Sequence, residues 1–237
     1  MPAYSDRSKA ICLAALAEVR RVLDGCGVDF RVIGGSAVLE VMQARPTAAT
    51  PVDYVGTLDV DLATPDWRSR RELERLLIRG GARRHATDPD RVLLSVTVEG
   101  DVVEAPVDLM TSSLFAAGAA GPSGSVLPLP ALLLSKLRPY ESKGEKDKDG
   151  YDAYMLLTHA AHDPEALAVE CARDLPRDLA LELLKLVEVF FLMKRKAARH
   201  ASNIFAEYHG ARRRDTQRLA VTAAERFVRT LRERLGA

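Results

Sequence analysis

Residues 56–64 read GTLDVDLAT and place two aspartates, Asp59 and Asp61, inside an otherwise apolar, strand-like stretch. In a β-strand, residues i and i+2 point to the same face, so both carboxylates stand side by side while the flanking aliphatic residues enter the core. Two carboxylates at that spacing repel each other, and a bound proton or cation relieves the repulsion. A hard divalent ion such as Mg²⁺ does this well because it prefers oxygen ligands. The stretch therefore predicts a strand with a metal site; the alternative is a solvent-facing pair on an edge strand.

A glycine pair precedes this strand. Residues 32–40 read VIGGSAVLE, which is typical of a strand that turns sharply into a helix. Gly34 and Gly35 let the backbone approach a ligand closely. The helix that begins near Ser36 offers free N–H groups to phosphate oxygens. A tight turn without a ligand is the alternative, but a phosphate cradle followed by paired aspartates is what metal-dependent phosphoryl or nucleotidyl transfer requires.

A third carboxylate usually completes a two-metal site, and residues 102–110, VVEAPVDLM, supply two candidates. Asp108 is the preferred one, on the second arm of a predicted hairpin, and Glu104 is its rival because it shares the same face by parity. The alternative role for Asp108 is that of a solvated acid at a strand end. Pro106 cannot donate to a ladder and predicts that this strand lies at an edge or bulges.

The periodicity along the chain predicts an α+β protein, with a mixed sheet in an N-terminal α/β domain (1–125) and a helical C-terminal domain (126–237). After an opening helix over 6–23, the glycine turn and a Pro/Thr-rich loop over 45–56 lead to the aspartate strand. Thr64 and Pro65 are expected as N-cap and first residue of the next helix. From Pro130 onward the pattern is helical, with one long helix over 176–199 and a last one over about 215–235. Trp67 and the Phe190–Phe191 pair are expected in the core.

Composition and charge narrow the class of protein. The 237 residues are 47% hydrophobic and include no apolar run of about 20 residues, so a membrane partner is not expected and a cytoplasmic location is. The net charge is +1, yet the segment from Lys194 to the end holds 12 Lys and Arg against 4 Asp and Glu. This basic tail indicates a polyanionic partner or, alternatively, an ordinary solvated helix face.

Two motifs resemble a known family. Gly34, Gly35 and Ser36 followed by TLDVDL resemble the polymerase-β-type nucleotidyltransferase superfamily. Residues 132–157, LLLSKLRPYESKGEKDKDGYDAYMLL, are similar to the K…(R/K)…KDxxDLY stretch of AbiEii-like nucleotidyltransferases, which are toxins of abortive-infection and related toxin–antitoxin systems. By that resemblance, Lys136 is the family lysine, Lys148 and Asp149 are the KD pair, and Asp152 is the second acid.

The resemblance implies nucleotidyl transfer from an NTP with release of pyrophosphate. Two Mg²⁺ ions would be held by Asp59, Asp61 and Asp108, and the triphosphate by Gly34, Gly35, Ser36 and Lys136. Asp149 would orient Lys136 or accept the proton of the acceptor hydroxyl. Without a ligand, Lys136 would only extend to the surface from an apolar helix face, and Asp149 would only favour a helix N-terminus.

The resemblance also points to RNA, and to tRNA in particular, as the acceptor, to the basic tail as its electrostatic footprint, and to a cognate antitoxin as a protein partner. Two alternatives stay open. The acceptor could be a small hydroxyl compound, such as an aminoglycoside-type antibiotic, or a protein side chain. The chain could also be a catalytically silent interaction module with the same fold.

Overall fold

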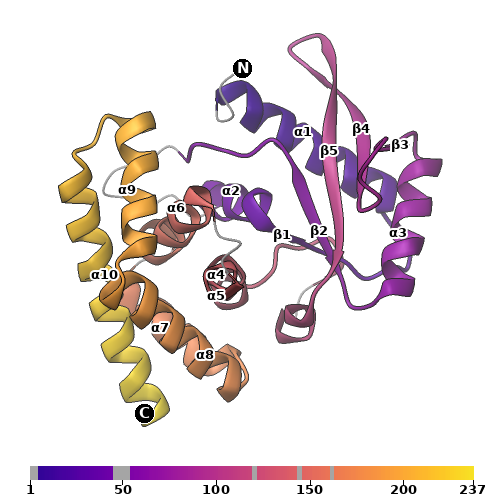
Figure 1. The fold of residues 1–237 in the computed structure, drawn as a ribbon. Helices are drawn as coiled ribbons and strands as arrows, with labels where there is room; N and C mark the ends of the chain where they lie inside the picture. The colour runs from indigo at the N-terminus through magenta and orange to yellow at the C-terminus, as the bar shows by residue number, and fades with distance from the viewer. Residues whose placement is uncertain (1–4, 45–53, 119–121, 143–145, 161–162) are drawn as a thin grey trace. The chain divides into compact units, whose positions relative to one another are not determined.

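The computed structural model describes residues 5–44, 54–118, 122–142, 146–160 and 163–237. The chain divides into two compact units, one comprising Met1–Glu40 and Tyr54–Leu127, the other Val41–Asp53 and Pro128–Ala237. One junction falls inside helix α2 (Gly34–Ala44), which begins in the first unit and ends in the second. The expected α+β class with a mixed sheet is confirmed (Figure 1).

The first unit holds a five-stranded sheet in the order β1-β2-β5-β4-β3. Its strands are β1 (Arg31–Ile33), β2 (Val60–Thr64), β3 (Arg83–Arg84), β4 (Arg91–Val98) and β5 (Asp101–Thr111). All neighbours run antiparallel except β2 and β5, which are parallel. This one parallel pair makes the sheet mixed and brings the aspartate strand next to the hairpin strand that carries Asp108.

The predicted hairpin is β4 and β5, joined by Glu99 and Gly100, both at positive φ. Two such residues form the tight turn whose twist matches the strands that it connects. The expectation that β5 lies at an edge or bulges at Pro106 holds only locally, because β5 as a whole lies between β2 and β4 but its residues up to Pro106 pair with β4 alone. The proline is tolerated for a local reason. Leu109 N–H points toward β4, so by alternation the nitrogen of Pro106 points toward β2, whose pairing with β5 begins only at Val107.

Helices α1 (Asp6–Leu23) and α3 (Trp67–Arg79) pack on the strands of the same unit. Alternate residues of β4, from Val92 to Val98, are buried, whereas the residues between them are half-buried or exposed. The sheet therefore has a core-forming face and a more polar face, as the period of two requires.

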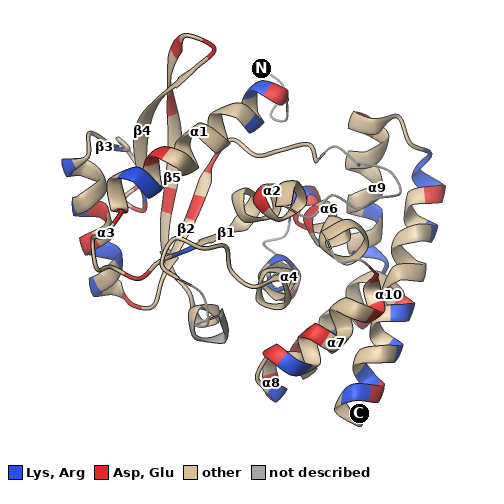
Figure 2. Cartoon of the chain, turned by 180° about the vertical axis from the view of Figure 1, so that it is seen from behind, with Lys and Arg blue, Asp and Glu red and all other residues tan. Residues whose placement is uncertain are grey.

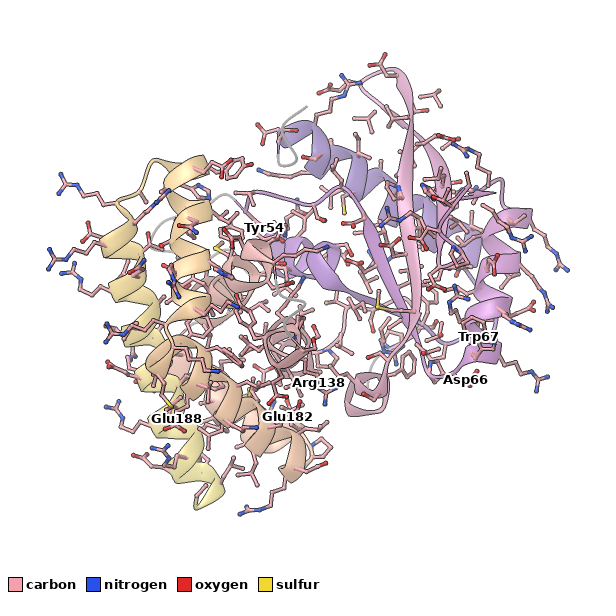
Figure 3. The ribbon with its side chains drawn as sticks, viewed as in Figure 1. Tyr54, Asp66, Trp67, Arg138, Glu182 and Glu188 are labelled. Carbon is pink, nitrogen blue, oxygen red and sulfur yellow. The ribbon has the colours of Figure 1, made fainter. Side chains whose placement is uncertain are left out.

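Helix α3 begins differently from the prediction. Its N-cap is Asp66, whose carboxylate accepts a hydrogen bond from Ser69 N–H at 2.8 Å (Figure 3). Thr64 instead ends β2, and its hydroxyl donates to the carbonyl of Asp66 at 3.1 Å. Thr64 stays paired with Thr111 of β5, so the helix begins later than predicted and Pro65 lies outside it.

The second unit is helical throughout its described residues. Its elements are α4 (Leu129–Leu137), α5 (Pro139–Ser142), α6 (Asp147–Met155), α7 (Pro164–Asp174), α8 (Arg177–Val187), α9 (Lys196–His209) and α10 (Arg213–Leu235), with π-helical turns η2 (Leu156–Ala160) and η3 (Glu188–Met193). A short 3-10 turn, η1 (Ser113–Gly118), belongs to the first unit. No helix within the described ranges is long and apolar enough to cross a bilayer.

The single long helix expected over 176–199 is wrong. The helix passes into the π-helical turn η3, and Arg195 then adopts a left-handed conformation with φ +52° before α9 begins. A left-handed residue ends a helix because it cannot continue the right-handed hydrogen-bond ladder. Phe190 and Phe191 are buried, as predicted.

Candidate metal centre

Three charged side chains form one row across the polar face of the sheet. Asp61 of β2 lies opposite Asp108 of β5 in the parallel register, and Asp108 lies opposite Arg91 of β4 in the antiparallel register. Paired residues of neighbouring strands share a face, so the register alone brings the two carboxylates and the guanidinium together.

Asp59 joins this row from the bend just before β2. The Thr57 hydroxyl donates to Asp59 Oδ1 at 2.6 Å, and the thiol of the buried Cys12 lies 3.6 Å from the Asp59 carbonyl oxygen. One carboxylate oxygen from each of Asp59, Asp61 and Asp108 lies within 4.8 Å of the others. All three residues are half-buried. This donor set, all carboxylate oxygen, fits a hard divalent cation such as Mg²⁺.

Gly34 lies against this cluster. Its φ is +66°, and a Cβ at this position would lie only 1.8 Å from Asp61 Oδ2. A side chain here would therefore displace the carboxylate, in addition to straining the backbone. The sequence suggested that this glycine allows a phosphate to approach closely. The structure shows that a glycine is needed here to leave room for the Asp61 carboxylate.

The hydroxyl group of Ser36 has a structural role. The side chain is buried, and Oγ donates to the Ile33 carbonyl at 2.9 Å and accepts from Asp61 N–H at 3.2 Å. This pair of bonds ties the first turn of α2 to the backbone of the aspartate strand. Gly35 is also buried, and its carbonyl lies 3.4 Å from the Tyr54 hydroxyl.

Arg91 is a member of the cluster that the sequence did not indicate. Its guanidinium binds Asp108 through two parallel bonds, Nε to Oδ1 at 2.5 Å and Nη2 to Oδ2 at 2.7 Å. The bonds to Asp108 and the nearby charge of Asp59 raise the pKa of Arg91 above its ordinary value, although partial burial opposes this. Arg91 is thus a fixed positive charge that orients Asp108 and offsets part of the cluster's negative charge.

Glu104, the rival third carboxylate, does not belong to the cluster. It lies on the predicted face, but its exposed carboxylate pairs with Arg83 of β3. The alternation of side chains could not distinguish Glu104 from Asp108, because the two residues are an even number of positions apart on one strand and therefore share a face. The register with β2 separates them, since it places Asp108 opposite Asp61.

Lys136 lies close to Asp149 and Asp152 in the second unit. These are the lysine and the two acids of the stretch, residues 132–157, that is similar to AbiEii-like nucleotidyltransferases. Lys136 Nζ lies 2.8 Å from Asp152 Oδ2, and Lys148 Nζ lies 2.8 Å from Asp152 Oδ1. Asp152 is completely buried; burial opposes its ionisation, but the two ammonium groups outweigh it and hold the pKa of Asp152 below its ordinary value. Lys136 is therefore held by a buried carboxylate rather than extended to the surface.

Asp149 is the weaker partner of Lys136. Its Oδ1 lies 3.8 Å from Lys136 Nζ, while its Oδ2 accepts a hydrogen bond from Lys146 N–H at 2.9 Å at the start of α6. Asp149 thus stabilises the helix N-terminus, which is the role that the sequence predicts for it in the absence of a ligand. That Lys136 and Asp149 act on a nucleotide stays a prediction.

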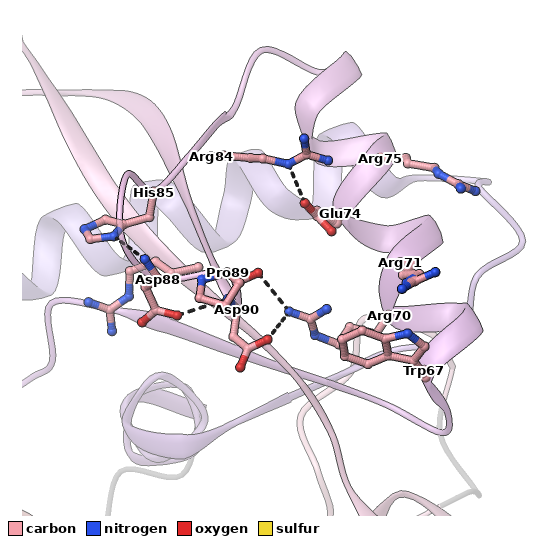
Figure 4. A pocket seen from close by; sticks show the side chains of 11 residues that line it. Trp67, Arg70, Arg71, Glu74, Arg75, Arg84, His85, Asp88, Pro89 and Asp90 are labelled. Carbon is pink, nitrogen blue, oxygen red and sulfur yellow. Dashed lines mark hydrogen bonds and ion pairs between the residues drawn. The ribbon is translucent and has the colours of Figure 1, made fainter.

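A cavity of about 460 Å³ lies beside Arg91 in the first unit, between α3, β3 and the loop before β4 (Figure 4). Trp67 lines it and is 50% exposed, so the expectation that Trp67 lies in the core is wrong. The guanidinium groups of Arg70 and Arg71 lie over its ring, which explains how an exposed indole is held. Arg70 is itself buried and bonds to the carbonyls of Leu109 and Pro89 and to Asp90.

A second arginine-rich surface lies in the second unit. A groove of about 770 Å³ runs along α9 and α10, in the basic tail that the sequence singled out. Figure 2 shows Lys and Arg along α10. The residues that line the groove are Arg195, Ala198, Arg212, Arg214, Asp215, Gln217, Arg218, Val221, Thr222 and Glu225.

Comparison of the chain with known proteins gave no match among protein-family models, curated proteins or solved structures.

Proposed function

We propose that this protein is a Mg²⁺-dependent nucleotidyltransferase that moves a nucleotidyl group from an NTP to an acceptor hydroxyl. The observation that carries the proposal is the convergence of Asp59, Asp61 and Asp108 next to Gly34, at the N-terminus of α2. Bound at these carboxylates, divalent ions would neutralise the charge that develops around the α-phosphorus.

The residues of the chain have separate roles in this proposal. Asp59, Asp61 and Asp108 hold the metal, and Arg91 orients Asp108 through its two bonds. Backbone N–H groups in the first turn of α2 face phosphate oxygens, since the Ser36 hydroxyl already serves the fold. The bond from the acceptor oxygen to the α-phosphorus forms, the bond from that phosphorus to pyrophosphate breaks, and a basic group takes the hydroxyl proton. Lys136 as a triphosphate contact and Asp149 as the proton acceptor belong to the same proposal.

RNA is the proposed acceptor, with tRNA as the class that the resemblance implies and an antitoxin as the matching protein partner. The arginine-lined groove of α9 and α10 supports a polyanionic partner of this kind. One observation favours the silent module instead. Arg91 engages both carboxylate oxygens of Asp108, so a metal at Asp108 must share those oxygens with the guanidinium.

Replacing Asp59 and Asp61 together by Asn tests the metal site. We expect Mg²⁺-dependent NTP binding, measured by titration calorimetry, to be lost, while the metal-free protein becomes slightly more stable because like charges are removed. Glu104→Gln is the matched control, because it removes a carboxylate from the same face of the sheet outside the cluster. It should leave binding unchanged.

Transfer itself is tested by incubating the protein with each labelled NTP, Mg²⁺ and total cell RNA and identifying what carries the label. Label on RNA that disappears in the Asp59→Asn/Asp61→Asn variant supports the proposal. A double variant that binds Mg-NTP as well as the parent does would show that the site is assigned wrongly. Mg-NTP binding without transfer to any acceptor would favour the silent module.

A further inference from the structure

Two groups of arginines in the basic tail differ in their partners. In the C-terminal half of α10, Arg226 and Arg229 pair with Glu165 of α7, and Arg232 pairs with Glu188 of η3. These three side chains serve contacts among helices of their own unit. Three guanidinium groups thus share two carboxylates, and they are less available to an anionic ligand than arginines without a carboxylate partner.

The second group lines the groove and lacks such partners. Among the described residues, no carboxylate lies within ion-pair distance of Arg195, Arg212 or Arg214. Arg218 has only a loose contact with Asp215, at 3.5 Å. Around the cavity beside Arg91, by contrast, four of the five lining arginines have a carboxylate partner; they are Arg70, Arg75, Arg84 and Arg91. Of these two surfaces, the α9–α10 groove leaves more arginines without a carboxylate partner, although Asp215 and Glu225 also line it.

Arg195 adds a conformational observation. It keeps a left-handed backbone conformation without being a glycine, between the π-helical turn η3 and α9, and the residue lines the groove. Such a conformation persists where the surrounding structure holds it.

The lining chemistry distinguishes among polyanions. None of the described residues that line the groove is aromatic, so it offers no platform on which unpaired bases could stack. It also lacks the aromatic and Met anchors that form the core of most protein interfaces. Phosphate contacts made by Arg, Gln and Thr need no stacking and suit a regular duplex backbone.

Two neutral side chains favour RNA over DNA. Gln217 lines the groove and donates one amide N–H to Ser202 Oγ at 3.0 Å, which leaves its second N–H and its carbonyl oxygen for a ligand. Thr222 adds an exposed hydroxyl. Acceptors and hydroxyls among phosphate-binding arginines match the 2′-hydroxyls that line the shallow groove of an RNA duplex and that DNA lacks.

We infer that the α9–α10 groove binds the sugar–phosphate backbone of base-paired RNA, with Arg195, Arg212 and Arg214 as phosphate contacts. The inference rests on the proposed function only for the role of this RNA as acceptor; the binding follows from the groove itself. Recognition is by charge and duplex shape and not by base sequence.

The test compares two charge-matched triple variants of the full chain. Arg195→Gln/Arg212→Gln/Arg214→Gln removes the unpaired arginines, and Arg226→Gln/Arg229→Gln/Arg232→Gln removes three paired ones. Dissociation constants for a labelled RNA hairpin are measured between 50 and 200 mM salt, with circular dichroism to verify folding. If three phosphates are contacted, the parent should lose affinity about 40-fold over this range. The first triple should lower the log–log salt slope by about 2 to 3, and the second should leave it nearly unchanged.

Other ligands identify the occupant. A single-stranded RNA of equal length and a DNA hairpin should bind at least several-fold more weakly, and a Glu/Asp-rich peptide should not compete. Equal losses in both triples, or tighter binding of the single strand, the DNA or the acidic peptide, would overturn the inference. The Asp59→Asn/Asp61→Asn variant should bind the hairpin like the parent. Hairpin binding that needs the groove arginines, without nucleotidyl transfer to RNA or to any other acceptor, would leave this inference standing and remove the proposed function.

Discussion

At the scale of single residues, Gly34 shows how the site depends on the absence of a side chain. Two constraints meet at this position: a φ of +66° and an Asp61 carboxylate where a Cβ would stand. The first is a property of the backbone, and the second ties the glycine to the metal cluster. A variant pair that separates the effect of backbone strain from the effect of the clash with Asp61 tests whether the turn is built around that carboxylate.

We expect Gly34→Ala to lower the free energy of unfolding by about 1–3 kcal/mol and to weaken Mg²⁺ binding strongly, because Asp61 must move away. Gly81→Ala is the matched control. It carries a φ of +104° with no atom within 4 Å of the added Cβ, so it adds backbone strain without a clash. It should lower stability and leave the metal affinity intact, as read by urea unfolding and calorimetry. Equal metal affinity in both variants would contradict the assignment.

At the scale of elements, Gly150 explains how α6 packs against α9. It lies inside a helix and is buried, where glycine lacks the helix propensity of alanine. A Cβ there would lie 2.6 Å from the Tyr140 hydroxyl, 2.7 Å from the Ala197 carbonyl oxygen and 2.8 Å from His200 Cβ. The carbonyl belongs to the backbone of α9 and cannot rotate away, so the glycine permits the close approach of the two helices.

Gly150→Ala should therefore destabilise the protein by about 1–3 kcal/mol, because overpacking outweighs the gain of about 1 kcal/mol expected from helix propensity alone. The midpoint of urea unfolding measures this directly. A midpoint above that of the parent would mean that α6 and α9 adjust freely and that the close contact is not a constraint.

At the scale of the whole molecule, two ionisable groups, the half-buried His159 and the buried Asp152, make stability fall in acid. Burial, with a smaller contribution from His209, lowers the pKa of His159 to about 4 from an ordinary value near 6.5. Between these two values the unfolded chain binds the proton and the folded chain does not, so the free energy of unfolding falls as the pH falls. The pKa of Asp152 is also below its ordinary value, and its contribution is lost at still lower pH.

We expect the free energy of unfolding to decline from about pH 6.5 to about pH 4, and His159→Gln to flatten that part of the curve. Urea unfolding at half-unit pH steps provides the measurement. The steeper fall below pH 4, to which Asp152 contributes, should persist in the variant. A variant that retains the complete decline between pH 6.5 and 4 would show that His159 is not its source.

The sequence by itself determined the local features. Strand and helix periods located β2, the β4–β5 hairpin and helices α1 and α10, because side-chain alternation and helical spacing are properties of short segments. The spacing of Asp59 and Asp61 predicted that their carboxylates converge, and the cluster confirms the convergence, but the expectation that both lie in the strand is wrong, because Asp59 lies in the bend just before β2.

Only the tertiary structure decided which partners these segments find. The parallel pairing of β2 with β5 selects Asp108 over Glu104, because it brings together residues far apart in the chain. The antiparallel register of β4 and β5 then places Arg91 opposite Asp108. The same holds for α10. Its sequence shows how many arginines it has, but only the packing of α10 against α7 and η3 decides which of them pair with a carboxylate. The partners in these ion pairs are more than 40 residues apart in the sequence, so only the fold brings them together and no local sequence pattern indicates that they pair.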